Sequence, residues 1–399
     1  MQPESCHHAQ DAFAQGLSPY MEIPVNTTPR LSNAIDYREL TQGAVAHDDA
    51  SDSISDAGIP EFPPQRDRRR SQNVELDPKS KIVFWLFRAI LHSLSLIPDF
   101  ILSALGVLGG RIAYRLDRRH IRIGLKNLEI AFPEKNETDR RQILRDSYIN
   151  LGRSAAEYIR LGGFFYRRLK KRTAYRGLPH FARAVRSNPG KGVLILTGHF
   201  GNFELLLAGH ALRGYQISLV HHTQRFLAGD ALMTYIRERA GVDIIRKHSA
   251  ARAVLRALKE GDQIGIPFDQ NAERSEAVFV PFFGEQAATP GAVARLAMIS
   301  QAPVVPVFMF RQPDQRNHLM TIHEAIPVQR TGDVEADVIE NTRRFVKAIE
   351  DAVRAHPDQF LWVHRRFRTR PRGMAPVYDW EVRKRRSGGA LATRAGERA

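Results

Sequence analysis

A histidine at the end of a predicted buried strand is the residue in this sequence best placed for acid–base chemistry. Residues 193–197 form an apolar, β-branched run, and His199 follows it after one glycine. Glu204 comes five positions later, where an apolar helical pattern begins. A neutral imidazole can accept a proton from a hydroxyl, and the N-terminal amides of the helix would add a positive pole beside it. We therefore expect a general-base site within residues 192–204.

The spacing of His199 and Glu204 has little weight by itself. With 15 histidines and 43 acidic residues in 399 positions, chance alone yields roughly 1.6 such pairs. A second pair, His47 and Asp52, is present in the chain. Context separates the two pairs, because ligands of open α/β sheets bind beyond the carboxyl ends of the strands. Residues five apart on an ideal helix lie about 140° apart, so His199 must precede the helix if it is to meet Glu204.

The pattern around this site predicts how it is held. From residue 192 onward, predicted strands and helices alternate. The predicted strands are 193–197, 216–221, 242–246, 263–268, 277–283, 303–310 and 318–326, and the predicted helices are 202–213, 228–240, 249–260, 290–301 and 335–355. This succession favours an α/β fold with a central, largely parallel sheet flanked by helices. Residues 117–190 are predicted to form the helices of a globular front.

Two apolar segments precede this domain. Residues 82–97 are mostly apolar, and their few polar positions follow one narrow helical stripe. Sixteen helical residues extend about 24 Å, which is short of the roughly 30 Å hydrocarbon core of a bilayer. We therefore favour an interfacial or partly inserted anchor over a full span, with a core helix as the alternative. Residues 100–116 are a second apolar stretch that could pack against the first, so N-terminal membrane-associated helices are expected.

The charge of the chain is divided unevenly. Lys and Arg total 59 against 43 Asp and Glu, a net charge of +16, whereas residues 1–65 carry ten acidic and two basic residues. The basic remainder suits an anionic membrane, a phosphorylated substrate, an acidic protein or nucleic acid. No aromatic platform or recognisable module supports nucleic-acid binding, so that partner is not expected. Cys6 is the only cysteine, which excludes an intramolecular disulfide and a cysteine-based metal cluster.

Six blocks spread over residues 196–371 carry a family pattern. They are LTGHFGNFE (196–204), GDQI (261–264), DQ (269–270), FVPFFG (279–284), AATPG (287–291) and WVHRRFRTRP (362–371). In these blocks the sequence resembles the late acyltransferases of lipid A biosynthesis, which belong with the lysophospholipid acyltransferases. The resemblance covers roughly residues 80–375. It implies transfer of a fatty acyl chain from a thioester to a lipid hydroxyl, at the cytoplasmic face of the inner membrane.

The resemblance also implies roles for single residues. His199 would take the proton of the acceptor hydroxyl, with Glu204 orienting the imidazole or holding the acceptor. Arg237 matches a conserved arginine of the family and could hold a phosphate or oppose the developing oxyanion. The backbone amides of Gly201 and Asn202 could share that second task.

Further residues of the matching blocks are expected to bind substrate. Asp269 has two open interpretations, a turn cap or a polar wall of the site, and Gln270 lies next to it. Arg365 and Arg366 belong to a basic run that a phosphorylated glycolipid or an acidic acyl carrier protein would attract. Three phenylalanines are favoured as core residues over an acyl slot. These are Phe279, Phe282 and Phe283.

One departure from the family pattern leaves the acceptor open. Relatives have a Tyr-Arg pair where this chain has His221 and His222, with Arg225 following. The two histidines also suggest a metal, but no cysteine or carboxylate is spaced with them, so local polar packing is favoured and no metal is expected.

We divide the chain into a disordered leader (1–78), a membrane-anchoring segment (79–116), an acyltransferase domain (117–378) and a basic flexible tail (379–399). Within the domain, a helical front (117–190) precedes the α/β core (191–378). The expected donor is acyl carrier protein, with acyl-coenzyme A as the alternative, and no cofactor is expected. The expected partners are an anionic membrane surface, the lipid acceptor and acyl carrier protein. Two alternatives are O-acylation of a lysophospholipid or other glycolipid, and a basic membrane- or nucleic-acid-binding protein with an inactive site.

Overall fold

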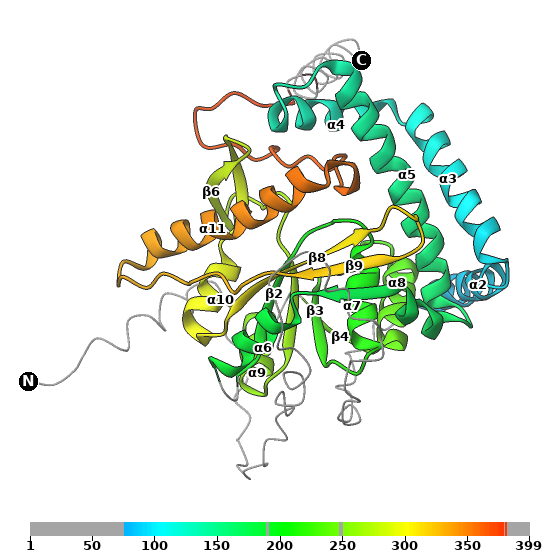
Figure 1. The fold of residues 1–399 in the computed structure, drawn as a ribbon, viewed down its shortest axis with the longest axis horizontal. Coiled ribbons are helices and arrows are strands. Elements are labelled where there is room, and N and C mark those ends of the chain that lie inside the picture. The colour runs from blue at the N-terminus through cyan, green and yellow to red at the C-terminus, as the bar shows by residue number, and fades with distance from the viewer. Residues whose placement is uncertain (1–75, 189–190, 247–249, 379, 381–399) are drawn as a thin grey trace, which may run out of the picture. The chain divides into compact units, whose positions relative to one another are not determined.

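The computed structural model describes residues 76–188, 191–246, 250–378 and 380 (Figure 1). The predicted leader up to residue 75 and the predicted tail apart from residue 380 lie outside the described residues. Among the described residues, four α-helices precede the sheet: α2 (Pro78–Leu94), α3 (Asp99–Leu116), α4 (Arg118–Ala131) and α5 (Glu137–Gly162). Helix α2 begins where Asp77 accepts the backbone N–H of Ser80 and Pro78 occupies the first turn, as expected of a capped helix start.

The core of the domain is a seven-stranded sheet with the order β1-β9-β8-β2-β5-β3-β4. Its strands are β1 (Thr173–Arg176), β2 (Val193–Thr197), β3 (Ile217–His221), β4 (Val242–Arg246), β5 (Gln263–Pro267), β8 (Val304–Arg311) and β9 (His318–Ile322). Five neighbouring strands, from β8 to β4, run parallel, whereas β9 is antiparallel to β8 and β1 is parallel to β9. The prediction of an α/β fold with a largely parallel sheet is confirmed.

The two faces of the sheet are covered by different helices. The helices of the α/β part are α6 (Leu178–Arg186), α7 (Phe203–Ala211), α8 (Leu227–Ala240), α9 (Ala250–Lys259), α10 (Ala292–Ser300) and α11 (Val334–Ala355). Leu194 and Leu196 of β2 pack with α9, α10 and α11, whereas Val193 and Ile195 pack with α6, α7 and α8. This alternation is the two-residue period of a strand buried on both faces. Helix α11 crosses one face in Figure 1.

Two strands were not predicted. Strand β1 lies in the region predicted to be a helical front, and it is only four residues long. Strand β7 (Glu285–Pro290) pairs with β6 (Ala277–Phe282) in a separate two-stranded sheet. Both contain little of the apolar alternation on which a strand prediction depends, so their partners rather than their own sequences define them. Phe282 and Phe283, expected in the core, are buried there.

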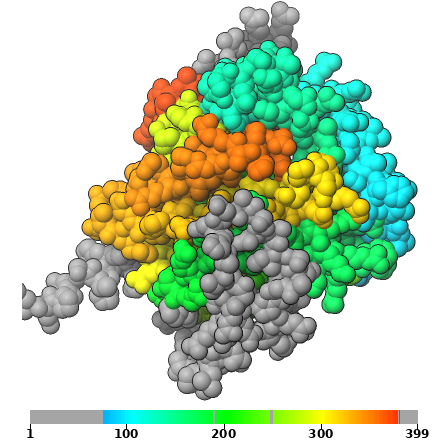
Figure 2. Space-filling view, in the orientation of Figure 1, coloured from blue at the N-terminus to red at the C-terminus, as the bar shows by residue number. Residues whose placement is uncertain are grey.

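Helix α3 packs against α5 through glycines. A Cβ added to Gly106 would collide with the carbonyl of Gly152, and one added to Gly110 would collide with the carbonyl of Tyr148. The absence of side chains at Gly106 and Gly110 therefore allows the two backbones to approach closely. The other side of α3 leaves large apolar side chains exposed, including Phe100, Leu105 and Leu116. Helices α2 and α3, in blue to cyan, form one edge of the face in Figure 2.

Among the described helices, none is by itself long and apolar enough to cross a bilayer. Helices α2 and α3 together would meet that length and composition, but a bend of 118° separates them. The predicted apolar segments are therefore helical as expected, and they are joined by a sharp corner at residues 95–98.

Candidate active site

His199 and Asp269 meet because their strands are neighbours. Strands β2 and β5 pair in parallel, with Thr197 opposite Pro267. Two residues further on, the Nδ1 atom of His199 lies 2.8 Å from the Oδ1 atom of Asp269. The backbone N–H of His199 also donates to Oδ2 at 3.1 Å. The carboxylate thereby favours the tautomer protonated at Nδ1, which leaves Nε2 as the proton acceptor.

The environment of this pair favours a charged imidazole more than water does. Burial is the largest influence on His199 and opposes its charged form, but the charge and hydrogen bond of Asp269, with the charge of Glu204, outweigh it. The pKa of His199 is therefore raised above its ordinary value of 6.5. Burial also opposes the charged form of Asp269 and by itself would raise its pKa. The charge and hydrogen bonds of His199 outweigh burial and keep that pKa below 3.8. Asp269 is thus an ionised, almost fully buried carboxylate.

An exposed residue lies beside both nitrogens of the imidazole. The amide nitrogen of Gln270 lies 3.3 Å from Nε2 and 3.4 Å from Nδ1 of His199, and Gln270 is exposed. The ring of Phe203 meets the imidazole edge to face, with 4.6 Å between the ring centres. An acceptor hydroxyl that displaced Gln270 would reach the basic nitrogen while Phe203 held the ring in place.

Glu204 does not make the hydrogen bond to His199 that we expected it to make as the orienting group. Its carboxylate binds Arg237 in a bidentate pair, with Arg237 Nε 2.9 Å from Oε2 and Nη2 2.5 Å from Oε1. The physical reason is the helix: Glu204 lies in the first turn of α7, which packs against α8, where Arg237 lies. Asp269 has the orienting position instead, and its two carboxylate oxygens bind the ring and the backbone N–H of His199.

Arg237 connects Glu204 to a second buried acid. Its Nη1 atom lies 2.9 Å from Nδ1 of His221, and Nε2 of His221 lies 2.7 Å from Oδ1 of Asp230. Arg246 completes the group through Oδ2 of Asp230 at 3.0 Å. The prediction of local polar packing for His221 is confirmed, whereas His222 is exposed. Asp230 was not predicted, since nothing in its helical pattern distinguishes it from a surface acid.

The turn after His199 is held by backbone and side-chain bonds. Gly201 has a φ of +52°, and its N–H donates to the carbonyl of Gln359 at 2.9 Å. That N–H is therefore engaged, so the expectation that it stabilises an oxyanion is wrong for this conformation. Asn202 caps α7 by accepting the N–H of Leu205, and its amide donates to Glu157 at 2.7 Å. The side chain of Asn202 is thus a buried helix cap, and the expected role of its backbone N–H stays a prediction.

Glu157 and Arg311 form a buried hub beneath this turn. Nη1 of Arg311 lies 2.5 Å from Oε1 of Glu157, and the side chains of Glu157 and Arg311 are 11% and 2% exposed. Nε2 of His318 lies 3.1 Å from the same oxygen. Arg311 also donates to Asn150 at 2.8 Å. These residues come from α5, β8 and β9, so only the packing of those elements brings them together. Neither Glu157 nor Arg311 was predicted.

The two arginines of the 362–371 block have different environments. Arg366 is buried and donates to the carbonyls of Ala288 and Gln270 and to the hydroxyl of Thr289. Burial lowers its pKa to about 10, with the charge of Asp269 opposing that change. Arg366 therefore connects the Asp269 loop to the β6–β7 sheet rather than presenting its charge to a substrate. Arg365 is half-buried.

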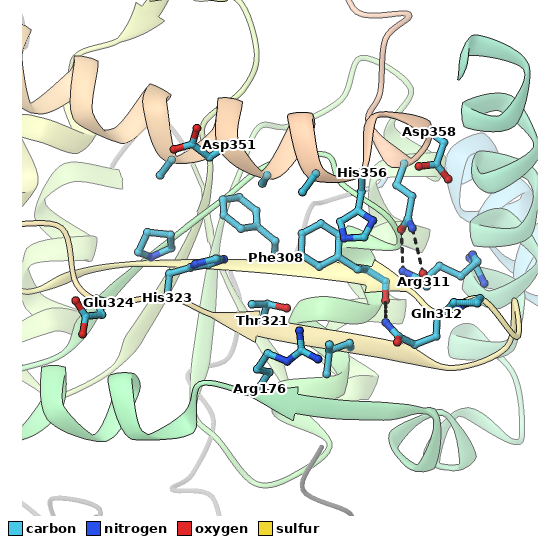
Figure 3. A pocket seen from close by; sticks show the side chains of 18 of the residues that line it. Arg176, Phe308, Arg311, Gln312, Thr321, His323, Glu324, Asp351, His356 and Asp358 are labelled. Atoms are coloured by element: carbon cyan, nitrogen blue, oxygen red, sulfur yellow. Dashed lines mark hydrogen bonds between the residues drawn. The ribbon is translucent and has the colours of Figure 1, made fainter. Parts of the chain in front are cut away.

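A groove of about 920 Å³ lies between α11 and strands β8, β9 and β1 (Figure 3). Phe308 and Phe310 form its floor, but both are almost completely buried. Its far end includes Arg311, whose backbone exchanges two hydrogen bonds with the side chain of Gln359. His199 and Asp269 are not among its lining residues. The groove therefore reaches Gln359 and Arg311, which support the turn after His199, but not His199 itself.

Comparison with known proteins decides the family. The family model described as bacterial lipid A biosynthesis acyltransferase matches residues 70–369, which contain both His199 and Asp269. The chain belongs to this family. It is therefore an acyltransferase. The lauroyltransferase of lipid A biosynthesis from Escherichia coli K12 is 28% identical over 296 residues, covering 74% of this chain and 94% of the relative.

Other relatives differ in the acyl group that they are named for. The lipid A biosynthesis myristoyltransferase of E. coli K12 is 26% identical, and the alignment covers 74% of this chain and 89% of the relative. A lipid A biosynthesis acyltransferase of Haemophilus influenzae is 28% identical over 74% of this chain and 94% of the relative. Within the part of this acyltransferase that the structure describes, no three His, Cys, Asp or Glu side chains converge as ligands for a metal ion.

Proposed function

We propose that this acyltransferase moves a fatty acyl chain from an acyl thioester to a hydroxyl of a lipid A precursor, with His199 as the general base. The observation that carries the proposal is the 2.8 Å bond between Nδ1 of His199 and Asp269. That bond leaves the opposite ring nitrogen basic, next to an exposed side chain that can be displaced. Membership in the lipid A acyltransferase family supports the acceptor class.

The proposed reaction needs no covalent acyl-enzyme. His199 Nε2 takes the proton of the acceptor hydroxyl while that oxygen attacks the thioester carbonyl. The carbonyl oxygen becomes an oxyanion, and the C–S bond then breaks. The imidazolium returns the proton to the leaving thiolate, so His199 ends in its starting form. Asp269 stabilises the imidazolium that exists between the two transfers and keeps the ring in its tautomer.

Arg237 is proposed to supply positive charge to this step. It is anchored by Glu204 and His221, and three of its five N–H groups are engaged in those bonds. A preorganised guanidinium near the imidazole opposes negative charge on either the oxyanion or an acceptor phosphate. In this proposal Glu204 acts through Arg237, as a positioning residue.

Membrane attachment is the third part of the proposal. The exposed apolar side chains of α2 and α3, together with exposed arginines such as Arg111, Arg115 and Arg118, suit the interface of an anionic bilayer. We propose that the enzyme works at the cytoplasmic face of the inner membrane. Full-length protein and a chain without residues 1–75 should sediment with liposomes, whereas a chain without residues 1–115 should not. Equal sedimentation of both deletions would contradict attachment by α2 and α3.

The experiment that tests the reaction is acyl transfer by the purified full-length chain in neutral detergent micelles. A lipid A precursor should gain the mass of one acyl chain, measured by mass spectrometry, and His199→Ala should abolish this gain. Wild-type rates in His199→Ala would disprove the general-base mechanism. Transfer to a lysophospholipid but not to the precursor would instead assign the alternative acceptor. Comparing acyl carrier protein with coenzyme A as donor, in the same assay, distinguishes the two thioesters.

A further inference from the structure

A cationic cavity lies at the corner between α2 and α3. It has a volume of about 220 Å³ and is lined by Arg160, Arg168 and Arg172, with Asp99 as its acidic residue. Three guanidinium groups against one carboxylate leave the cavity with a net positive charge. It shares no lining residue with the His199 site.

The back of this cavity is a rigid frame. Arg160 is 8% exposed and donates to the carbonyls of Ser95 and Ile97, at the end of α2. It also pairs with Asp99 at 2.7 Å, and Arg172 binds the other oxygen of Asp99. Through these carbonyls and this carboxylate, Arg160 links the residues after α2 to the first residue of α3 at the bend.

The front of the cavity has a cation without an acidic partner. Arg168 is exposed and stacks on Phe165 at 4.6 Å, and it makes no ion pair with any residue that the structure describes. It belongs to η2 (Tyr166–Arg172), where five of seven residues are basic and none is acidic. The potential at the cavity mouth is therefore positive, and an anion would complete it.

Exposed apolar side chains lie in the lining of the cavity or next to its lining residues in the sequence. Leu96, Phe100 and Phe164 each leave more than half of their surface exposed. Leu96 itself lines the cavity, and Phe100 and Phe164 are sequence neighbours of the lining residues Asp99 and Phe165. A cationic cavity with exposed apolar side chains in its lining and next to its lining residues complements a molecule with an anionic head and hydrocarbon tails.

We propose that this cavity binds the anionic headgroup of a membrane phospholipid, with Arg168 and Arg172 on its phosphate and with its acyl chains beside Phe100 and Phe164. The inference rests on the proposed membrane attachment, but not on the proposed reaction. Basic pockets at the membrane surface bind phospholipid headgroups by this combination of charge and apolar contact. The corner would then hold α2 and α3 at a defined depth and orientation.

The test uses short-chain phosphatidylglycerol, below its micelle concentration, with the full-length chain in neutral detergent. A monomeric lipid does not present a charged surface, so delocalised attraction is removed. We expect saturable binding of one lipid per chain and weaker binding of short-chain phosphatidylcholine. Arg168→Gln should weaken the binding by about fivefold or more, the effect of one basic side chain near an anionic lipid.

Lys171→Gln is the matched control, because Lys171 is exposed on the same helix, carries the same charge and does not line the cavity. It should change the affinity by less than about twofold, since its charge is not in contact with the headgroup. Equal losses in the two variants, or no saturable binding, would overturn the proposal. Displacement of the lipid by inorganic phosphate at the same concentration would also overturn it, because the site would then recognise free phosphate. Acyl transfer by the wild type without lipid binding would disprove the lipid site but not the proposed reaction. Lipid binding without acyl transfer would disprove the proposed reaction but not the lipid site.

Discussion

The imidazole of His199 is hydrogen-bonded at 2.8 Å to the carboxylate of Asp269, which lies 70 residues away in the sequence. The nearest acid of the same sequence block, Glu204, is instead bound by Arg237. Two separate pairs therefore meet at the carboxyl edge of the sheet. One pair orients a base, and the other places a guanidinium close enough to influence that base.

Replacing Asp269 with Asn should lower the rate without removing the substrate site. The amide keeps the shape of the side chain but loses the charge that selects the Nδ1-protonated tautomer, so kcat should fall by about 10²- to 10⁴-fold. Steady-state kinetics in detergent micelles measures this change. Asp337→Asn is the control, because Asp337 is also buried but its partners are Thr331 and Gly332. Comparable rates for the two variants would mean that Asp269 has no special connection with His199.

The activity should fall as the pH is lowered. The pKa of His199 is raised above 6.5, so the base becomes protonated, and kcat/KM declines, as the pH falls through that raised value. In Asp269→Asn the main cause of the increase is absent, and the acidic limb should move to lower pH. His364 should not contribute, since burial lowers its pKa to about 4. A pH–rate profile with an identical acidic limb in both proteins would exclude His199 as the titrating group.

The same shift predicts the effect of pH on folding. Because the folded-state pKa of His199 is raised, its pair with Asp269 contributes most stability below pH 6.5, and this contribution is lost as the pH rises through the folded value. Urea unfolding at several pH values should show this loss in the wild type and a smaller one in His199→Gln. An equal dependence in both proteins would assign the effect to other groups.

Glu204→Gln should destabilise the fold and slow the reaction together. It leaves Arg237, whose side chain is 9% exposed, without its carboxylate, and breaking such a buried pair costs about 3–5 kcal/mol. The exposed pair between Glu137 and Arg141 is the control, where Glu137→Gln should cost about 1 kcal/mol or less. In the double variant Glu204→Gln with Arg237→Met, the free energy of unfolding should partly recover while kcat/KM stays low. Recovery of both would limit the pair to a structural role.

Glu157→Gln should affect kcat more than KM. The variant removes the carboxylate that accepts hydrogen bonds from Asn202 and Arg311. The turn that positions His199 would then shift, while the imidazole itself is unchanged. A displacement of about 1 Å can cost roughly 10²-fold in rate. Glu285→Gln, which leaves the mostly buried Arg370 without its acid away from the turn, controls for stability. If Glu157→Gln and Glu285→Gln had equal kcat values at the same folded fraction, this role of Glu157 would be contradicted.

The α/β succession, the mostly parallel sheet and the strand end that carries His199 were determined by the sequence alone. Apolar runs and helical periods are local, so they located β2, α7 and α11 to within a few residues. The proposal of His199 as the base also rests on its sequence block and its position at a strand end. The apolar character of α2 and α3 was visible in the same way, as two mostly apolar stretches.

Only the tertiary structure decided the partners of these residues. Strands β3 and β4 separate β2 from β5 in the sequence, but β5 lies beside β2 in the sheet. For this reason Asp269, rather than Glu204, meets His199. The pairing of Glu204 with Arg237 and the hub of Glu157 with Arg311 likewise depend on how helices pack against strands. Local periodicity reports which face of an element is apolar, but strand order and helix packing are set by the whole core, and they place polar groups from distant segments within hydrogen-bonding distance.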